Sequence, residues 1–228
     1  MEAAGIQSLF AETGGKFCIP AADIQLKLQK IKAFIFDWDG VFNDGSKKDL
    51  TGSGFAEPDA MGTNILRFSY WLQTKTLPTT AILTGEENES ALILGKRERF
   101  NSLYFKASNK LKSFEHFLST HQLKGDEVAF IFDDVLDLGV ASQCGVRIVA
   151  HRSSNPMFNR YLLNHRLCDY MTSQPGGQAA VREACELLIG LYGNYDLAIS
   201  NRMQFSDLYK EYLATRQQVE TSIYSGLS

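Results

Sequence analysis

The sequence predicts an α/β fold in which a doubly wound, mostly parallel sheet is flanked by helices. Short apolar runs alternate along the chain with longer amphipathic segments, an order typical of parallel strands connected by helices. The apolar runs are rich in Ile, Val, Phe and Tyr and lack polar alternation, as expected of strands buried on both faces. The 228 residues, 44% of them hydrophobic, suffice for one sizeable core.

Six runs are predicted to be strands, and three amphipathic segments between them are predicted to be helices. The strands are expected at 33–37, 80–84, 102–105, 128–132, 146–150 and 169–171. The apolar stripes of the helices are Met61, Ile65, Phe68 and Leu72; Leu111, Phe114, Phe117 and Leu118; and Val181, Ala184, Cys185 and Leu188. Their spacing of three and four residues places each set on one helical face.

The regions outside this alternation divide the chain further. Residues 1–28, with two adjacent glycines and a proline, are expected to be an irregular lead-in, and 29–200 to be the main domain. In 201–228, the stretch 205–223 carries apolar residues on one helical face and is expected to be a helix that packs on the body or on a neighbouring subunit. The Asn-Asp-Gly-Ser turn at 43–46, followed by a polar stretch to Gly54, predicts an irregular hairpin.

Charge and composition exclude several partners. The 23 basic and 26 acidic residues give a net charge of -3, without the basic excess that nucleic-acid binding requires, so no nucleic-acid partner is expected. The apolar runs are far shorter than the ~20 residues needed to cross a bilayer, so no membrane partner is expected. The first residues lack a basic, apolar signal segment, and the four cysteines show no CxxC spacing, which favours a cytoplasmic location.

Polar residues follow several predicted strands directly. Because ligands of doubly wound sheets bind beyond the carboxyl ends of the strands, we expect these residues to share one site. The acids among them repel one another unless a cation or protonation relieves the charge, and an oxygen-only ligand set favours Mg²⁺. The residues are Asp37, Asp39 and Gly40; Thr84 and Gly85; Lys110; and Asp133, Asp134 and Asp137.

These residue types suit phosphoryl transfer. Asp37 is expected to attack phosphorus and form an aspartyl-phosphate, while Asp39 protonates the leaving oxygen and then deprotonates water. Thr84 and Lys110 are expected to hold the phosphoryl oxygens. Mg²⁺ would be bound by Asp37, the backbone carbonyl of Asp39, and Asp133. For Asp134 and Asp137, helix capping and a place at the metal site stay open as alternatives.

The ordered motifs resemble those of the haloacid dehalogenase superfamily of phosphatases over about 33–191. Residues 34–45 (FIFDWDGVFNDG) are similar to the first motif, 82–85 (ILTG) to the second, 108–111 (SNKL) to the third and 133–137 (DDVLD) to the fourth. Receiver domains also place acids, a Thr and a Lys at strand ends, but their acidic pair precedes a single phospho-accepting Asp. Here the DxD comes first, which excludes them.

Spacing predicts a form without a cap domain. The gaps of 44 residues between Asp39 and Thr84 and of 25 between Thr84 and Lys110 are too short for an additional domain of ~50 residues. Residues 175–183 (PGGQAAVRE) and 59–62 (DAMG) resemble segments of the capless 3-deoxy-D-manno-octulosonate 8-phosphate phosphatases and of relatives acting on nonulosonate 9-phosphates. This resemblance implies hydrolysis of a phosphorylated keto-deoxy sugar acid by a homotetramer whose hairpins and neighbouring subunits close the sites.

Departures from the family pattern leave the substrate open. Glu86 stands where these phosphatases have Arg, and Phe132 and Ala179 stand where they have Gly. Gly85, Lys96 and Arg182 are candidate substrate-binding residues, although Lys96 and Arg97 also fit a solvated basic face, and Arg182 also fits a pair with Glu186 at i,i+4. The alternatives are a phosphatase of another phosphorylated metabolite and a non-catalytic binding module.

Overall fold

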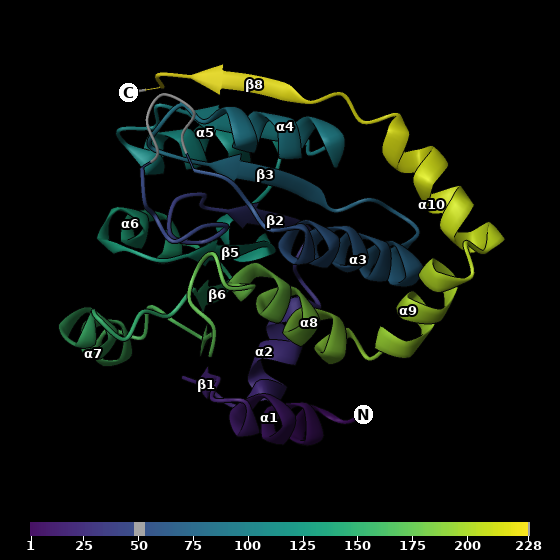
Figure 1. Ribbon diagram of the computed structural model, residues 1–228, viewed down its shortest axis with the longest axis horizontal. Helices are drawn as coiled ribbons and strands as arrows, with labels where there is room; N and C mark the ends of the chain where they lie inside the picture. Colours follow the sequence, from purple (N-terminus) through teal and green to yellow (C-terminus); the bar gives the residue numbers. More distant parts are fainter. Residues whose placement is uncertain (48–52, 228) are drawn as a thin grey trace.

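The computed structural model describes residues 1–47 and 53–227. Its described part contains an eight-stranded sheet in the order β1-β7-β6-β5-β2-β3-β4-β8, parallel except for the β1–β7 pair, which confirms the predicted fold class (Figure 1). The strands are β1 Lys16–Phe17, β2 Ala33–Phe36, β3 Thr79–Leu83, β4 Ser102–Phe105, β5 Val128–Phe132, β6 Val146–Val149, β7 Tyr170–Met171 and β8 Ser222–Ser225. The six predicted strands match β2 to β7, with ends that differ by at most one residue.

Helices cover both faces of the sheet. They are α1 Ala3–Glu12, α2 Ala21–Leu28, α3 Glu57–Thr74, α4 Glu89–Arg97, α5 Lys110–His121, α6 Leu138–Ala141, α7 Pro156–Asn164, α8 Ala180–Tyr192, α9 Tyr195–Met203 and α10 Asp207–Gln217. The three helices predicted from apolar stripes are α3, α5 and α8. Between β2 and β4, the described residues form α3, β3 and α4 but no additional domain, as the spacing predicted.

Two hydrophobic cores lie on opposite faces of the sheet because side chains alternate along each strand. In β2, Phe34 and Phe36 belong to the core beneath α3 and α8, whereas Ala33 and Ile35 belong to the core beneath α5. All four residues are buried. The sheet is therefore the central layer of three, and the central strand β2 is apolar throughout because neither of its faces meets water.

The N-terminal prediction was wrong in its local structure: residues 1–28 are not irregular. They form α1, α2 and the short strand β1, which pairs antiparallel with β7. Gly14, with φ +100°, follows α1, and Pro20 is the N-cap residue of α2, so these residues mark the ends of short elements. Ile6 and Ile24 bury against the body and hold this segment in place.

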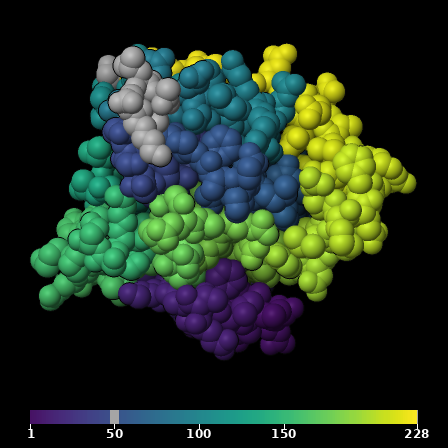
Figure 2. Space-filling model, viewed as in Figure 1, coloured from purple at the N-terminus to yellow at the C-terminus, as the bar shows by residue number. Residues whose placement is uncertain are grey.

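The C-terminal prediction of one helix over 205–223 was also wrong. Phe205 lies outside a helix with φ 49°, the helix α10 ends at Gln217, and β8 adds a parallel strand to β4. The helix α10 packs on the body, because Tyr209 and Tyr212 are buried against Phe68 of α3. Figure 2 shows the N-terminal segment in purple and the C-terminal segment in yellow on different sides of the molecule, where their strands form opposite edges of the sheet.

The predicted hairpin is described only in part. The Asx turn at 43–46 is confirmed, since the Asp44 side chain accepts from Ser46 N at 2.9 Å and the Asn43 side chain accepts from Gly45 N at 2.8 Å. Residues 48–52 lie outside the described residues. Among the described helices, none has the length and apolar character needed to cross a bilayer.

Candidate active site

Asp37 directly follows β2, the strand at which the order of the sheet reverses. β3 lies on one side of β2 and β5 on the other, so a crevice opens beyond their carboxyl ends. The Asp37 N–H donates to Ile131 O of β5 at 2.9 Å and fixes the residue against that neighbour. Asp133 follows β5, so the first and fourth motifs meet at one rim. Both side chains are buried.

Gly40 allows the first motif to turn beside Asp133. Its φ is +85°, and an added Cβ would lie 1.9 Å from Asp133 Oδ2. The Asn43 side chain accepts from Gly40 N at 3.3 Å and donates to Trp38 O at 3.1 Å, which closes the turn. A side chain at position 40 would therefore displace the acid from the rim.

Lys110 is the first residue of α5, after the N-cap residue Asn109. Its Nζ lies 2.7 Å from Asp37 Oδ1 and 2.6 Å from Asp137 Oδ1 in a buried environment. Burial lowers the pKa of Lys110, but the two carboxylates outweigh this and raise the pKa above its ordinary value. The ammonium is therefore charged and links the third and fourth motifs to the first.

Three carboxylates meet around this lysine. Oxygens of Asp37, Asp133 and Asp137 lie within 4.8 Å of one another. The pKa of Asp133 is raised to about 8 and that of Asp137 to about 7. Burial is the largest cause for both, and the negative charge of Asp37 is the second largest. A divalent cation would relieve this repulsion, and the oxygen-only donor set fits Mg²⁺. Asp134 instead caps a 3₁₀ turn by accepting from Val135 N at 2.7 Å.

The side chain of Asp39 lies outside this three-acid cluster. Its Oδ2 is 2.8 Å from Lys47 Nζ, and its Oδ1 accepts a hydrogen bond from Ser53 Oγ. Ser53 Oγ in turn accepts from Asn88 Nδ2 at 3.1 Å. The carboxylate is thus contacted by two groups from the segment that follows the first motif, and Asn88, which follows the second motif, positions one of them. The metal ligand predicted for Asp39 is its backbone carbonyl and not this side chain.

A cavity of about 410 Å³ opens over these groups. It contains the predicted residues Thr84 and Gly85 together with Glu86, whose N–H donates to Thr84 Oγ1 at 3.3 Å. Two cations that were not predicted from the sequence also line the cavity, Lys47 and Arg152. The signal for Arg152 was its position three residues after β6, at the same carboxyl edge as the predicted site.

Two predicted substrate-binding residues lie elsewhere. Lys96 is exposed in the last turn of α4. Because α4 runs from the carboxyl end of β3 to the amino end of β4, its last turn lies away from the carboxyl edge of the sheet. Arg182 pairs with Glu186 on the next turn of α8, with Nη2 2.6 Å from Oε1, and neither residue lines the cavity. The structural alternatives for both residues, a solvated face and an i,i+4 pair, are the ones observed.

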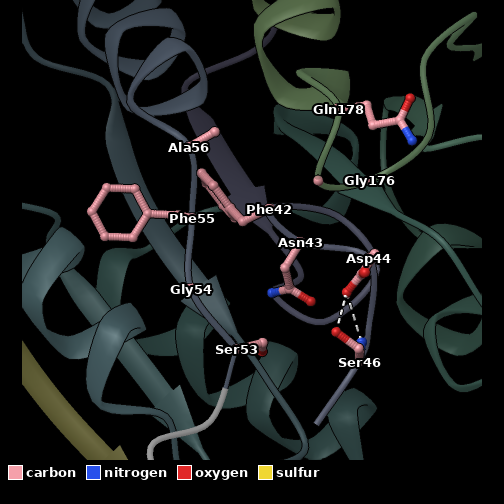
Figure 3. A pocket seen from close by; sticks show the side chains of 11 residues that line it. Phe42, Asn43, Asp44, Ser46, Ser53, Gly54, Phe55, Ala56, Gly176 and Gln178 are labelled. Carbon is pink, nitrogen blue, oxygen red and sulfur yellow. Dashed lines mark hydrogen bonds between the residues drawn. The ribbon is translucent and has the colours of Figure 1, made fainter. Parts of the chain in front are cut away.

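A second cavity, of about 340 Å³, lies on the other side of the turn at 43–46 (Figure 3). Asp44 and Ser46 face this cavity, whereas Gly45 and Lys47 line the first one. Gly176 closes its far wall, where an added Cβ would lie 2.0 Å from Gly40 O. The late glycine segment therefore packs directly against the first motif.

Comparisons with known proteins agree with this arrangement. No family model matches the chain. The 3-deoxy-D-manno-octulosonate 8-phosphate phosphatase KdsC of Escherichia coli is 32% identical over 184 residues, which cover 78% of this chain and 89% of that protein.

Solved structures of similar enzymes share the fold. The 3-deoxy-D-manno-octulosonate 8-phosphate phosphatase of Yersinia pestis superposes with a TM-score of 0.59 at 27% identity, covering 76% of this chain and 89% of that one. The enzyme of Moraxella catarrhalis, solved with magnesium ion, phosphate ion and the KDO molecule, gives a TM-score of 0.64 at 25% identity and covers 78% and 97%.

The fold and the site together define a phosphatase of the haloacid dehalogenase type without a cap domain in its described residues. Within this class, the chain belongs to the family of the 3-deoxy-D-manno-octulosonate 8-phosphate phosphatases. Ala179, at a position where the family pattern has Gly, has φ 68°. That left-handed conformation favours glycine and gives a physical reason for the family residue.

Proposed function

We propose that this chain is a Mg²⁺-dependent phosphomonoesterase that hydrolyses a phosphorylated keto-deoxy sugar acid such as 3-deoxy-D-manno-octulosonate 8-phosphate. The observation that carries the proposal is the contact of Lys110 with both Asp37 and Asp137, beside Asp133 at the same rim. The similarity to named phosphatases supports the reaction class, and the boundary of the catalytic domain at 29–200 is proposed with it.

In the proposed reaction, an Asp37 carboxylate oxygen attacks phosphorus, and the bond from phosphorus to the sugar oxygen breaks. Asp39 gives its proton to that oxygen, so the sugar acid leaves as an alcohol. Water then attacks the aspartyl-phosphate, returns a proton to Asp39 and releases inorganic phosphate. Lys110 and Thr84 hold the phosphoryl oxygens, and Gly85 leaves open space beside them, since a Cβ there would meet nothing within 4 Å.

Asp37, Asp133 and the backbone carbonyl of Asp39 are the proposed ligands of Mg²⁺, with Asp137 beside them. When bound, the ion neutralises negative charge where an anionic nucleophile meets an anionic phosphate ester. The raised pKa values of Asp133 and Asp137 support this role, because crowded carboxylates bind a cation at the expense of protons.

The test is release of inorganic phosphate from 3-deoxy-D-manno-octulosonate 8-phosphate and from p-nitrophenyl phosphate. We expect activity with Mg²⁺, loss of activity with a chelator, recovery when Mg²⁺ is restored, and at least 10³-fold lower kcat for Asp37→Asn. Full activity of Asp37→Asn would refute the covalent mechanism. A wild-type protein that binds Mg²⁺ and phosphate without turnover would indicate the binding module instead.

A panel of neutral sugar phosphates separates the proposed substrate from other metabolites. Preference for the phosphate of a neutral sugar over the sugar-acid phosphates would favour the alternative substrate class.

We also propose a homotetramer, as the family resemblance implies, with light scattering coupled to size-exclusion chromatography as its test. A monomeric active enzyme would contradict that assembly.

A further inference from the structure

The cavity contains a surplus of negative charge that an anionic substrate must overcome. Six carboxylates and three cations line it among the described residues, and Glu86 is one of the six. Lys96 and Arg182, which were expected to supply positive charge, lie outside it. Among the described residues, the positive charge that this cavity offers to a substrate comes from Lys47, Lys110 and Arg152, in addition to Mg²⁺ when it is bound.

Two of these cations are committed to the proposed catalytic acids. The Lys110 side chain is 6% exposed and lies between Asp37 and Asp137. Lys47 pairs with Asp39. Arg152 also contacts an acid of the site, since its Nη2 lies 3.1 Å from Asp133 Oδ2, and its side chain is 30% exposed. A guanidinium carries five N–H donors, more than one contact with a carboxylate uses.

The backbone around Arg152 is held on both sides. Arg152 O accepts from Asn159 Nδ2 of α7 at 3.0 Å, and His151 N donates to Thr172 Oγ1 at 3.1 Å. The guanidinium lies against the first motif, because a Cβ on Gly40 would approach Arg152 Nη2 to 2.4 Å and one on Gly45 to 3.0 Å. The side chain is thus positioned before substrate arrives, which lowers the entropic cost of binding.

The strand order separates Arg152 from the phosphoryl-binding end of the cavity. Along the carboxyl edge, β3, β2, β5 and β6 are successive neighbours, and they are followed in turn by Thr84, Asp37, Asp133 and Arg152. At ~4.8 Å per strand, the backbone at Arg152 lies roughly 14 Å from that at Thr84, and the guanidinium reaches from β6 to Asp133 Oδ2. A phosphoryl group between Asp37 and Thr84 therefore leaves this guanidinium, beside Asp133, for a second anionic group of the substrate.

We propose, on the basis of the proposed function, that Arg152 binds the carboxylate of the phosphorylated sugar acid. This residue supplies a positive charge to a cavity in which Glu86 stands at the position of the family Arg. The planar guanidinium matches a carboxylate through paired hydrogen bonds, and the chain of carbon atoms between carboxylate and phosphate in an octulosonate 8-phosphate allows the two groups to bind at different places in one cavity.

The test compares two substrates that differ in the carboxylate. For Arg152→Gln, we expect the KM for 3-deoxy-D-manno-octulosonate 8-phosphate to rise about 10- to 100-fold with kcat within a few-fold, and the KM for p-nitrophenyl phosphate to stay within two-fold. Arg152→Lys should recover part of the loss. Arg160→Gln, an exposed residue of α7, is the matched control and should change neither KM. An equal rise for both substrates, or no change for either, would overturn the proposal.

Binding measured without turnover separates this inference from the proposed function. Calorimetry should show that Arg152→Gln weakens binding of the unphosphorylated 3-deoxy-D-manno-octulosonate about 10-fold or more and leaves inorganic phosphate binding unchanged in the presence of Mg²⁺. Wild-type hydrolysis of p-nitrophenyl phosphate with no binding of the sugar acid would refute the role of Arg152 and leave the phosphatase activity standing. Absence of hydrolysis of either substrate would refute the proposed function itself.

Discussion

Lys110 and Asp37 form a buried ion pair, with Nζ 2.7 Å from Oδ1, and Asp137 holds the same ammonium at 2.6 Å. Buried charges tolerate the loss of water only when they are paired. The lysine therefore has a structural effect as well as its proposed chemical one, since it compensates two carboxylates that face a third at Asp133.

Removing this cation should destabilise the fold. We expect Lys110→Gln to lower the free energy of unfolding by about 3–5 kcal/mol at pH 8, because two buried carboxylates lose their partner. The loss should be smaller at pH 6, where Asp137, whose pKa is about 7, accepts a proton. Urea denaturation at both pH values measures it. Lys112→Gln, an exposed change on the same helix, is the control; equal losses for the two variants would contradict the argument.

Gly40→Ala should push the first motif and Asp133 apart at the carboxyl edge of the sheet. The new Cβ would overlap Asp133 Oδ2 in a backbone with φ +85°, so we expect a loss of about 1–3 kcal/mol in stability and at least 10-fold weaker Mn²⁺ binding by electron paramagnetic resonance. Gly54→Ala, where an added Cβ meets nothing within 4 Å, should leave both quantities close to wild type. Unchanged Mn²⁺ affinity in Gly40→Ala would refute the steric role of the glycine.

The buried carboxyl group of Asp59 should make the free energy of unfolding depend on pH. Its Oδ1 accepts from Arg182 N at 2.9 Å at the start of α8, its Oδ2 has no hydrogen-bond partner, and burial raises its pKa to about 6. The folded state therefore binds this proton more tightly than the unfolded chain, and the contribution of Asp59 to stability falls as pH rises from about 4 to about 7.

Asp59→Asn removes this titration. We expect the free energy of unfolding of the variant to rise relative to that of the wild type by up to roughly 3 kcal/mol between pH 4 and pH 7. Parallel denaturant titrations of the two proteins across this range measure the difference. A difference independent of pH would show that Asp59 does not titrate in this window.

Ala179→Gly should stabilise the chain. Ala179 precedes α8 with φ 68° and ψ 29°, a conformation that costs an L-residue about 1 kcal/mol and costs glycine little. We expect a gain of about 0.5–1 kcal/mol in thermal or urea unfolding. Ala180→Gly, one residue further into the helix, should instead lose about 1 kcal/mol. A loss in both variants would mean that flexibility at position 179 outweighs the relief.

Tyr224 anchors the edge strand β8. Its ring stacks on Tyr104 with centroids 4.9 Å apart and meets His116 edge-on at 4.7 Å. We expect Tyr224→Ala to cost about 1–2 kcal/mol and to promote association at high concentration, because release of β8 exposes the β4 edge. Unfolding and light scattering measure the two effects. Ile223→Ala, at a side chain 46% exposed, should have little effect on either.

Elements with strong local signals could be predicted from the sequence. The largely apolar strands β2 to β7 and the striped helices α3, α5 and α8 lie where the pattern predicted them, because the residue types themselves indicate which positions are buried. The edge strand β8 was missed because Ser222–Ser225 is mostly exposed and alternates between types. Its strand conformation depends on pairing with β4, a partner far away in the sequence.

The sequence by itself determined the class of site: strand-end acids, a threonine and a lysine in a fixed order imply a phosphoryl-transfer edge, since parallel strands bring their carboxyl ends together. Tertiary structure alone decided which cations reach that edge. Lys96 and Arg182 lie outside the cavity, whereas Arg152 lines it because β6, the strand that precedes Arg152, pairs with β5. Helix direction and strand neighbours set those distances, and neither is encoded in the spacing of one residue from the next.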